Sequence, residues 1–415
     1  MPEATARRSW GRRMVRKVSS EGVGYSIADL TQVRYLFVSG IPRNGADLFE
    51  QAYGALTTVA RVMHEEGARG GIVRQDIFIR DHALIPDCKK IIEEFYCDDL
   101  PATDYIVQPP CGGKLLEIEA WGVSRQKGRV EIERVSEHLV LLRHSDITWA
   151  HCAGIVPQTP APGVHDRALD AFGRMRDLLA ASGFRFGQVL RTWLYLGDIV
   201  GPEGDTQRYK ELNRARADFY RDTRFLEPYL VPSVHSAVYP ASTGIGAGDR
   251  DVMMSCVALA TERKDIRLLP LENPLQVSAF RYGQHYSQQS PKFSRAMAIL
   301  GPEVVATLVS GTASIVDAET RFVGDVERQT QQTLDNMEAL LARENFQRHG
   351  VADAGASLQD LVLARVYVKR REDYAKVRAI CKARLGELPV TFAVADVCRP
   401  DLLVEIEGIA FAPRG

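Results

Sequence analysis

The chain has 415 residues, of which 45% are hydrophobic and 25% charged, and its formal net charge is −1. This composition fits a globular protein of about two to four domains and gives no overall attraction to nucleic acid or acidic membranes. No stretch reaches the roughly 18 apolar residues of a membrane span, and no apolar segment follows the first arginines as a secretory signal requires. The sequence therefore predicts a cytoplasmic protein that binds neither nucleic acid nor membranes.

The spacing of cysteine and histidine gives no sign of a metal site. The seven cysteines form no CxxC pair, and the nine histidines show neither HxH nor HExxH spacing. An odd number of unpaired cysteines is typical of reduced thiols rather than of a disulfide framework. We therefore expect free thiols and no bound metal.

The N-terminal segment is basic, with "RRSWGRRMVRK" at 7–17, and residues 1–17 are interpreted as a solvated, disordered leader. After it, one structural unit occurs three times. Each copy contains an apolar strand that ends in a turn of small residues: "YLFVSGIP" (35–42), "WAHCAGIVP" (149–157) and "TLVSGTASIV" (308–316). A helix with amphipathic spacing, a strand, a second helix and a closing strand follow each time. The predicted order is β–β–α–β–α–β in each copy, with linkers near 124–137 and 262–278.

The closing strands differ in their acidic residues. "KLLEIEAWGV" (114–123) nearly repeats "DLLVEIEGIA" (401–410), whereas "VMMSCVALA" (252–260) carries no acid. In the last strand, alternation places Leu403, Glu405 and Glu407 on one side of the sheet. Val404 and Ile406 lie on the opposite side. One side is predicted to be core, and the other to face water, a partner or a site.

The repeated unit resembles the YjgF/RidA family, whose fold is a six-stranded mixed sheet carrying two helices. The shared features are the "SG" turn, an early Gln in the first helix, "LPAT" or "LPVT" at 100–103 and 388–391, and the terminal "EIE" strand. That family forms trimers with ligand clefts between subunits, so three tandem copies imply an α+β fold arranged as a monomeric, intramolecular pseudo-trimer. The expected repeats are 18–125, 130–262 and 273–413.

In the imine/enamine deaminases of that family, an arginine binds the substrate carboxylate. The corresponding regions of this chain contain Thr103 and Thr391 instead. Without a guanidinium group there, a free amino- or imino-acid carboxylate loses its bidentate partner. Simple deaminase chemistry is therefore disfavoured.

Residues 130–413 resemble a narrower group, the chorismatases, which cleave the enolpyruvyl ether of chorismate. The resemblance rests on "YPASTGIG" (239–246), "NPLQVSAFRYG" (273–283), "SPKFSRAM" (290–297), "LVSGTASIVDAET" (308–320) and "ADVCRPDLLVEIEG" (395–408). It implies that Glu405 is the catalytic acid and that Arg378, on the last helix, binds substrate. Gly311 and Cys398 resemble the members that form 3-hydroxybenzoate, whereas members that form a dihydroxycyclohexadiene carboxylate carry Ala and Gln there. Gly311 is expected to leave room for substrate deep in its turn.

Cleavage of an enol ether begins with protonation of its methylene carbon, so the acid must remain protonated near neutral pH. Burial between two repeats would raise the pKa of Glu405 in this way. Chorismate carries two carboxylates, which arginines, hydroxyls and backbone N–H groups can bind. The expected substrate-binding residues are Gly311, Thr312, Tyr239, Ser242, Thr243, Tyr209, Arg216 and Arg295. The predicted partner is a small-molecule substrate, and this route requires no metal or organic cofactor.

Three classes of function remain open from the sequence. The first is a chorismatase that forms 3-hydroxybenzoate and pyruvate. The second is another enzyme on this scaffold, either a chorismatase hydrolase that gives a dihydroxycyclohexadiene carboxylate or a RidA-like deaminase. The third is a non-catalytic ligand-binding protein, which the loss of acids at 252–260 allows. Structural readings of single residues also remain: the acid pair on a solvated edge, Cys398 as a small buried hydrophobic residue, and Arg378 paired with Glu372 or Glu387.

Overall fold

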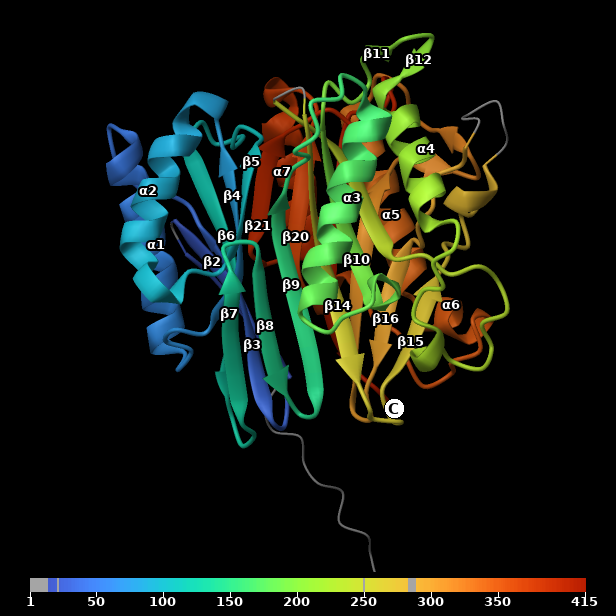
Figure 1. The fold of residues 1–415 in the computed structure, drawn as a ribbon, viewed down its shortest axis with the longest axis horizontal. Helices are drawn as coiled ribbons and strands as arrows, with labels where there is room; N and C mark the ends of the chain where they lie inside the picture. Colours follow the sequence, from blue (N-terminus) through green and yellow to red (C-terminus); the bar gives the residue numbers. More distant parts are fainter. Residues whose placement is uncertain (1–13, 21, 249–250, 283–288) are drawn as a thin grey trace, which may run out of the picture.

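The computed structural model describes residues 14–20, 22–248, 251–282 and 289–415. Its main strands form three six-stranded sheets, here named sheets 1, 2 and 3 in chain order. Figure 1 shows these sheets standing side by side with the helices on the outside, α1 and α2 flanking sheet 1 and α3 in front of sheet 2. Among the described residues, no helix is both long and apolar enough to cross a membrane.

Sheet 1 has the strand order β1-β2-β3-β6-β4-β5, in which only β4 and β5 are parallel neighbours. Its elements are β1 (Val15–Ser20), β2 (Val23–Asp29), β3 (Val33–Gly40), α1 (Leu48–Glu65), β4 (Ile72–Ile79), α2 (Ile85–Tyr96), β5 (Ala102–Val107) and β6 (Leu116–Arg125). Helix α1 begins where the Asp47 side chain accepts a hydrogen bond from the N–H of Glu50. Its buried residues, among them Ala52, Leu56 and Val59, recur at helical spacing and cover the sheet.

Sheets 2 and 3 repeat this topology. Sheet 2 consists of β7 (Val130–Ser136), β8 (Leu139–His144), β9 (Ile147–Ile155), α3 (Val164–Ala181), β10 (Val189–Gly197), α4 (Arg208–Tyr220), β13 (Ala241–Ala247) and β14 (Val252–Thr261). Sheet 3 consists of β15 (Arg267–Leu271), β16 (Ala296–Leu300), β17 (Val304–Ala313), α5 (Val326–Leu341), α6 (Arg343–Arg348), β20 (Leu361–Val368), α7 (Tyr374–Leu385), β21 (Val390–Val394) and β22 (Val404–Pro413). Two short hairpins complete the strands: β11 (Pro202–Glu203) with β12 (Thr206–Gln207), and β18 (Ile315–Val316) with β19 (Glu319–Thr320).

The sequence pattern missed strands at the edges of the sheets. The predicted order had four strands per unit, whereas each sheet has six, in the order β–β–β–α–β–α–β–β. The expected leader ended at residue 17, but β1 begins at Val15 and pairs with β2; residues 1–13 lie outside the described part. Likewise β15, at 267–271, falls in the expected linker and before the expected start of the third repeat at 273. An edge strand has one neighbour and little buried surface, so its hydrophobic pattern is weak.

The three sheets meet at a buried cluster of charged side chains. Arg74 of β4 forms ion pairs with Asp76 and Asp104 within sheet 1 and donates to the carbonyl of Cys152 in sheet 2 at 3.2 Å. Arg365 of sheet 3 pairs with Asp76 and Glu119 of sheet 1, and Arg191 of sheet 2 pairs with Glu407 of sheet 3. These buried charges are therefore paired within sheet 1 and across the sheet boundaries, as buried charges require.

Candidate active site

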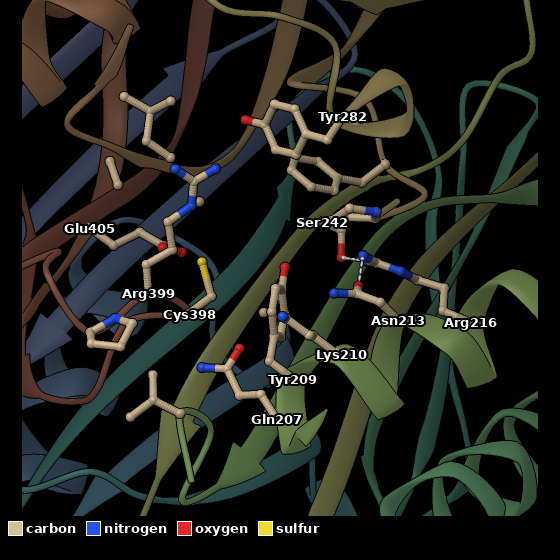
Figure 2. Close-up of a pocket in the computed structure, with 18 of the residues that line it drawn as sticks. Gln207, Tyr209, Lys210, Asn213, Arg216, Ser242, Tyr282, Cys398, Arg399 and Glu405 are labelled. Atoms are coloured by element: carbon tan, nitrogen blue, oxygen red, sulfur yellow. Dashed lines mark hydrogen bonds between the residues drawn. The ribbon is translucent and has the colours of Figure 1, made fainter. Parts of the chain in front are cut away.

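A cavity of about 430 Å³ lies between sheets 2 and 3. One wall comes from α4 and β13 of sheet 2, and the other from β17, the start of β22 and the segment 398–400 of sheet 3. Figure 2 shows side chains from both walls pointing into the same space. Its lining is formed by Val200, Gln207, Tyr209, Lys210, Asn213, Arg216, Ser242, Gly244, Tyr282, Pro291, Phe293, Arg295, Gly311, Ala313, Ile315, Cys398, Arg399, Pro400 and Glu405.

Glu405 supplies the carboxyl group of this cavity. It is the second residue of β22, directly opposite Tyr367 of β20, and it is only 4% exposed. Burial, reinforced by the neighbouring Glu407 carboxylate, raises the pKa of Glu405 to about 8, although Arg191 and Arg295 oppose the shift. The Glu405 carboxyl is therefore mostly protonated at neutral pH, and the solvated edge considered for the acid pair is excluded.

The position of the Glu405 side chain depends on Gly311. Strand β17 has a register shift against β22 between Val309 and Thr312, a β-bulge that leaves Gly311 beside the acid. A methyl group at Gly311 would overlap Oε1 of Glu405 and lie 2.9 Å from its Cδ. The space that the glycine leaves is thus occupied by the carboxyl of Glu405, not by a deeper substrate position as the sequence suggested.

Cys398 lines the cavity from the segment that precedes β22. Burial, with a smaller contribution from the Glu405 carboxylate, raises the pKa of its thiol to about 12. The group is therefore a neutral thiol, which is a weak hydrogen-bond donor and not a thiolate nucleophile. Figure 2 shows Cys398 between Glu405 and Tyr209.

Four basic side chains face the cavity: Lys210, Arg216, Arg295 and Arg399. Arg216 donates to Asn213 Oδ1 at 2.5 Å and to Ser242 Oγ at 3.3 Å, the two bonds drawn in Figure 2. Its Nε is buried without a hydrogen-bond partner among the described residues, and the same holds for Nε of Arg295. Such unsatisfied donors beside a cavity fit an anionic ligand.

One face of α4 lines the cavity. Tyr209, Asn213 and Arg216 all project from α4 toward sheet 3. The Tyr209 ring packs under Gly244, where an added Cβ would lie 3.0 Å from Cε2. Burial raises the pKa of the Tyr209 phenol, which therefore remains protonated. Together with Ser242, Arg295, Gly311, Cys398 and Glu405, most of the residues selected from the sequence lie around one space.

Four selected residues lie elsewhere. Arg378 is exposed on α7 and does not line this cavity, so its substrate role stays a prediction. Tyr239 packs against Phe280, with ring centroids 5.5 Å apart, outside the lining. Thr312 is buried, and its hydroxyl donates to the carbonyl of Ser310 at 3.0 Å. Thr243 stands behind the wall, where its Oγ1 accepts the N–H of Gly311 at 2.9 Å.

Several lining residues were not predicted from the sequence. Lys210 and Gln207 lie one and two residues from Tyr209, at the start of α4, so the helix prediction could have included them. Tyr282 and Phe293 come from the segment between β15 and β16, which only the folded chain brings to the cavity. Arg295 Nη2 donates a hydrogen bond to the Tyr282 hydroxyl oxygen at 2.5 Å. Among the described residues, no group of three His, Cys, Asp or Glu side chains is placed to hold a metal ion.

Two family models match the chain over sheets 2 and 3. The family described as chorismatase FkbO/Hyg5-like, N-terminal, matches residues 125–260, and the family described as endoribonuclease L-PSP matches residues 289–412. A crystal structure of a chorismatase, 24% identical in sequence, covers 92% of this chain and 100% of its own with a TM-score of 0.64. The structural likeness therefore establishes a shared fold.

Curated relatives agree with these matches. A 3-hydroxybenzoate synthase of Streptomyces hygroscopicus is 33% identical over 278 residues, covering 63% of this chain and 76% of that protein. A chorismatase of Streptomyces rapamycinicus is 34% identical over 274 residues, covering 64% of this chain and 77% of that protein. The chain thus belongs to the chorismatase family.

Proposed function

We propose that this protein cleaves the enolpyruvyl ether of chorismate to 3-hydroxybenzoate and pyruvate, with Glu405 as the general acid. The observation that carries the proposal is a buried carboxyl, protonated at neutral pH, in a cavity with four basic side chains. A substrate with two carboxylates matches that charge, and an enol ether requires that acid. The names of the curated relatives support the same reaction.

In the first step, the Glu405 carboxyl transfers its proton to the methylene carbon of the enolpyruvyl group. The carbon becomes a methyl group, and the positive charge is shared with the ether oxygen as an oxocarbenium ion. The Glu405 carboxylate formed in this step is then the nearest counter-charge. Arg216 and Arg295 are proposed to bind the substrate carboxylates, and Lys210 and Arg399 extend the cationic wall.

In the second step, the C4 hydroxyl oxygen attacks C3 of the ring, and the C3–O bond breaks to release pyruvate. The hydroxyl proton returns to a carboxylate such as Glu405, and opening of the resulting epoxide with loss of the C3 proton gives the aromatic ring. Chorismate is thereby divided into 3-hydroxybenzoate and pyruvate without consuming water. Capture of the oxocarbenium ion by water would instead give a dihydroxycyclohexadiene carboxylate.

The proposal is tested by incubating purified protein with chorismate and measuring pyruvate with a coupled lactate dehydrogenase assay. Chromatography of the same mixture identifies the ring product. Equal amounts of pyruvate and 3-hydroxybenzoate are expected. Formation of pyruvate together with the dihydroxycyclohexadiene carboxylate (the dihydrodiol) would contradict the assigned ring product. If the protein released no more pyruvate than a Glu405→Gln control, the reaction itself would be contradicted and a binding function favoured.

We further propose that the three sheets are tandem YjgF/RidA-like repeats forming one intramolecular pseudo-trimer. The identical strand order in each sheet and the charge cluster where they meet support this arrangement. With the edge strands included, the repeats extend over about 15–125, 130–261 and 267–413. One chain then contains both walls of the site, so a monomer suffices. A monomeric state and a cytoplasmic location stay predictions.

A further inference from the structure

Glu407 lies two residues after Glu405 on β22 but does not line the cavity. Its side chain is 3% exposed, and its carboxylate is surrounded by donors from sheets 2 and 3. Trp193 Nε1 donates to Oε1 at 2.9 Å and the Tyr367 hydroxyl at 3.1 Å, while Arg191 and Thr243 donate to Oε2. Nη1 of Arg365 also lies 3.4 Å from Oε1. The reaction proposed above uses none of these groups directly.

We infer that Glu407 is a positioning residue for Glu405, acting through its negative charge and through a hydrogen-bonded link to Gly311. The inference deepens the proposed function, because it rests on Glu405 acting as the acid. Residues two apart on a strand face the same side, so the two carboxyl groups are neighbours. A fixed anion beside Glu405 disfavours a second anion and so favours the protonated form that enol ether cleavage requires.

The charge effect depends on every group that faces Glu405. The charged neighbours are Glu407 of β22, Arg191 of β10 and Arg295 of the segment that ends at β16. The thiol of Cys398 and the phenol of Tyr209 are neutral neighbours. Arg399, Arg216 and Lys210 line the same cavity. Burial and the charge of Glu407 favour the acid form of Glu405, whereas Arg191 and Arg295 oppose it.

The link to Gly311 runs through the Thr243 hydroxyl, which takes part in three hydrogen bonds. Thr243 donates its hydroxyl proton to Glu407, and the same oxygen accepts Nη2 of Arg191 at 2.6 Å and the N–H of Gly311 at 2.9 Å. Gly311 in turn packs against the Glu405 carboxyl. Glu407 therefore holds the bulge that determines where the Glu405 side chain can lie.

The experiment is an infrared titration of the Glu405 carboxyl in the full-length protein, without substrate. The carbonyl band of the protonated carboxyl is followed against pH. From each spectrum, the spectrum of the same protein with the added change Glu405→Gln is subtracted, so that the band of Glu405 remains. This readout does not depend on turnover. If Glu405→Gln left chorismate cleavage intact, the proposed function would fail while the coupling between the two carboxyls could still be measured.

Two substitutions should move the titration in opposite directions. Glu407→Gln removes a negative neighbour, so the midpoint of Glu405 should fall by about one pH unit. Arg191→Gln removes a positive neighbour, so the midpoint should rise by a similar amount. If these substitutions merely loosened the wall and admitted water, both would lower the midpoint. Arg191→Gln separates the two explanations, because only the inference predicts a rise. An unchanged or opposite shift in either folded variant overturns the inference.

Two further variants complete the test. Glu407→Asp keeps the charge but shortens the side chain, so the midpoint should stay near the parental value while kcat falls about tenfold through the lost bond to Thr243. Glu119→Gln is the matched control: Glu119 is as buried as Glu407 and also pairs with Arg365, but it lies on β6 of sheet 1. It should destabilise the fold without shifting the midpoint. If Glu119→Gln shifted the midpoint as much as Glu407→Gln, the effect would belong to the whole buried charge cluster, and the inference would be contradicted.

Discussion

Glu405 on β22 and Glu117 on β6 occupy corresponding positions in sheets 3 and 1. Glu405 pairs with Tyr367 of β20, and Glu117 pairs with Phe78 of β4; each is followed two residues later by a second glutamate. Both side chains are 4% exposed, and burial raises the pKa of each to about 8. A buried carboxyl of raised pKa therefore does not by itself distinguish a site from a structural position.

The difference lies in the strand beside each acid. Strand β3 pairs with β6 without a register shift as far as Gly40, and the Ser39 hydroxyl donates to Glu117 at 2.9 Å. In sheet 3 the bulge in β17 turns the corresponding Ser310 toward Ser294 and leaves Gly311 beside Glu405. The Glu117 carboxyl is thus bound by a hydroxyl of sheet 1, whereas the Glu405 carboxyl faces the cavity.

Sheet 2 provides a third case. Strand β9 has a register shift opposite Met254 and Cys256, much like that of β17, but the residue that pairs with Tyr195 is Met253 rather than an acid. Sheet 1 therefore has the acid without the bulge, sheet 2 the bulge without the acid, and sheet 3 both. In sheet 3 their combination, next to the basic face of α4, places a carboxyl in the lining of the cavity.

The largest expected effect comes from the acids themselves. Glu405→Gln should lower kcat for chorismate cleavage by about 10²–10⁴-fold, the usual contribution of a positioned general acid, while substrate binding is retained. Glu117→Gln removes the corresponding acid of sheet 1 and should leave kcat within about threefold of the parent. Steady-state pyruvate release measures both. Similar losses in the two variants would remove the distinction between the sheets.

The next effect tests the helices that cover the two acids. Arg216→Gln on α4 should reduce kcat/KM by about 10–100-fold, mainly through KM, because a charge-assisted bond to a substrate carboxylate is lost. The control is Arg378→Gln on α7, whose side chain is exposed and outside the cavity; it should behave like the parent. Loss of activity in Arg378→Gln alone would return the substrate role to α7.

The absence of Arg378 from the cavity lining has a topological cause. Resemblance placed a substrate arginine on the last helix, but the cleft beside Glu405 takes its helix from sheet 2, so α4 provides the basic residue. The turn that precedes α7 lies beside the loop between β5 and β6 of sheet 1 instead, where Arg371 Nε donates to the carbonyl of Cys111 at 3.4 Å. Glu405, Cys398 and Gly311 were predictable because two short motifs contain them, one at the start of β22 and one at the turn of β17. Tyr282 and Phe293 were not, because the segment between β15 and β16 reaches the cavity only in the folded chain.

A third prediction concerns pH. Because the pKa of Glu405 is about 8 in the folded protein, its acid form predominates below that pH and is lost above it. The rate should be nearly constant from about pH 6 to 7.5 and fall roughly tenfold per unit above about pH 8.5. A carboxyl whose folded pKa exceeds its unfolded value also stabilises the fold less as pH rises from about 4.5 to 8. Glu405→Gln should therefore reduce the loss of thermal stability over that range, whereas an unchanged stability profile would contradict the raised pKa.

The smallest effect on rate is expected where the product is chosen. Gly311→Ala would place a methyl group against Oε1 of Glu405, so the carboxyl must move away from the bulge and toward the cavity. Cys398→Gln replaces a neutral thiol with an amide that can hold a water molecule beside the oxocarbenium ion. The parent should form mainly 3-hydroxybenzoate, because a thiol binds water poorly and the C4 hydroxyl is the nearer nucleophile.

In the double variant, turnover should stay within about tenfold of the parent while the dihydrodiol fraction rises, since Glu405 still delivers the proton and only the nucleophile changes. The two single variants separate the causes: Gly311→Ala should mainly slow the reaction by displacing the acid, and Cys398→Gln should mainly alter the product. Chromatography of timed samples gives both quantities from one reaction. An active double variant with parental product would mean that these two residues do not control the access of water to the ion, and that the rest of the cavity, rather than the bulge and its neighbouring thiol, selects the nucleophile.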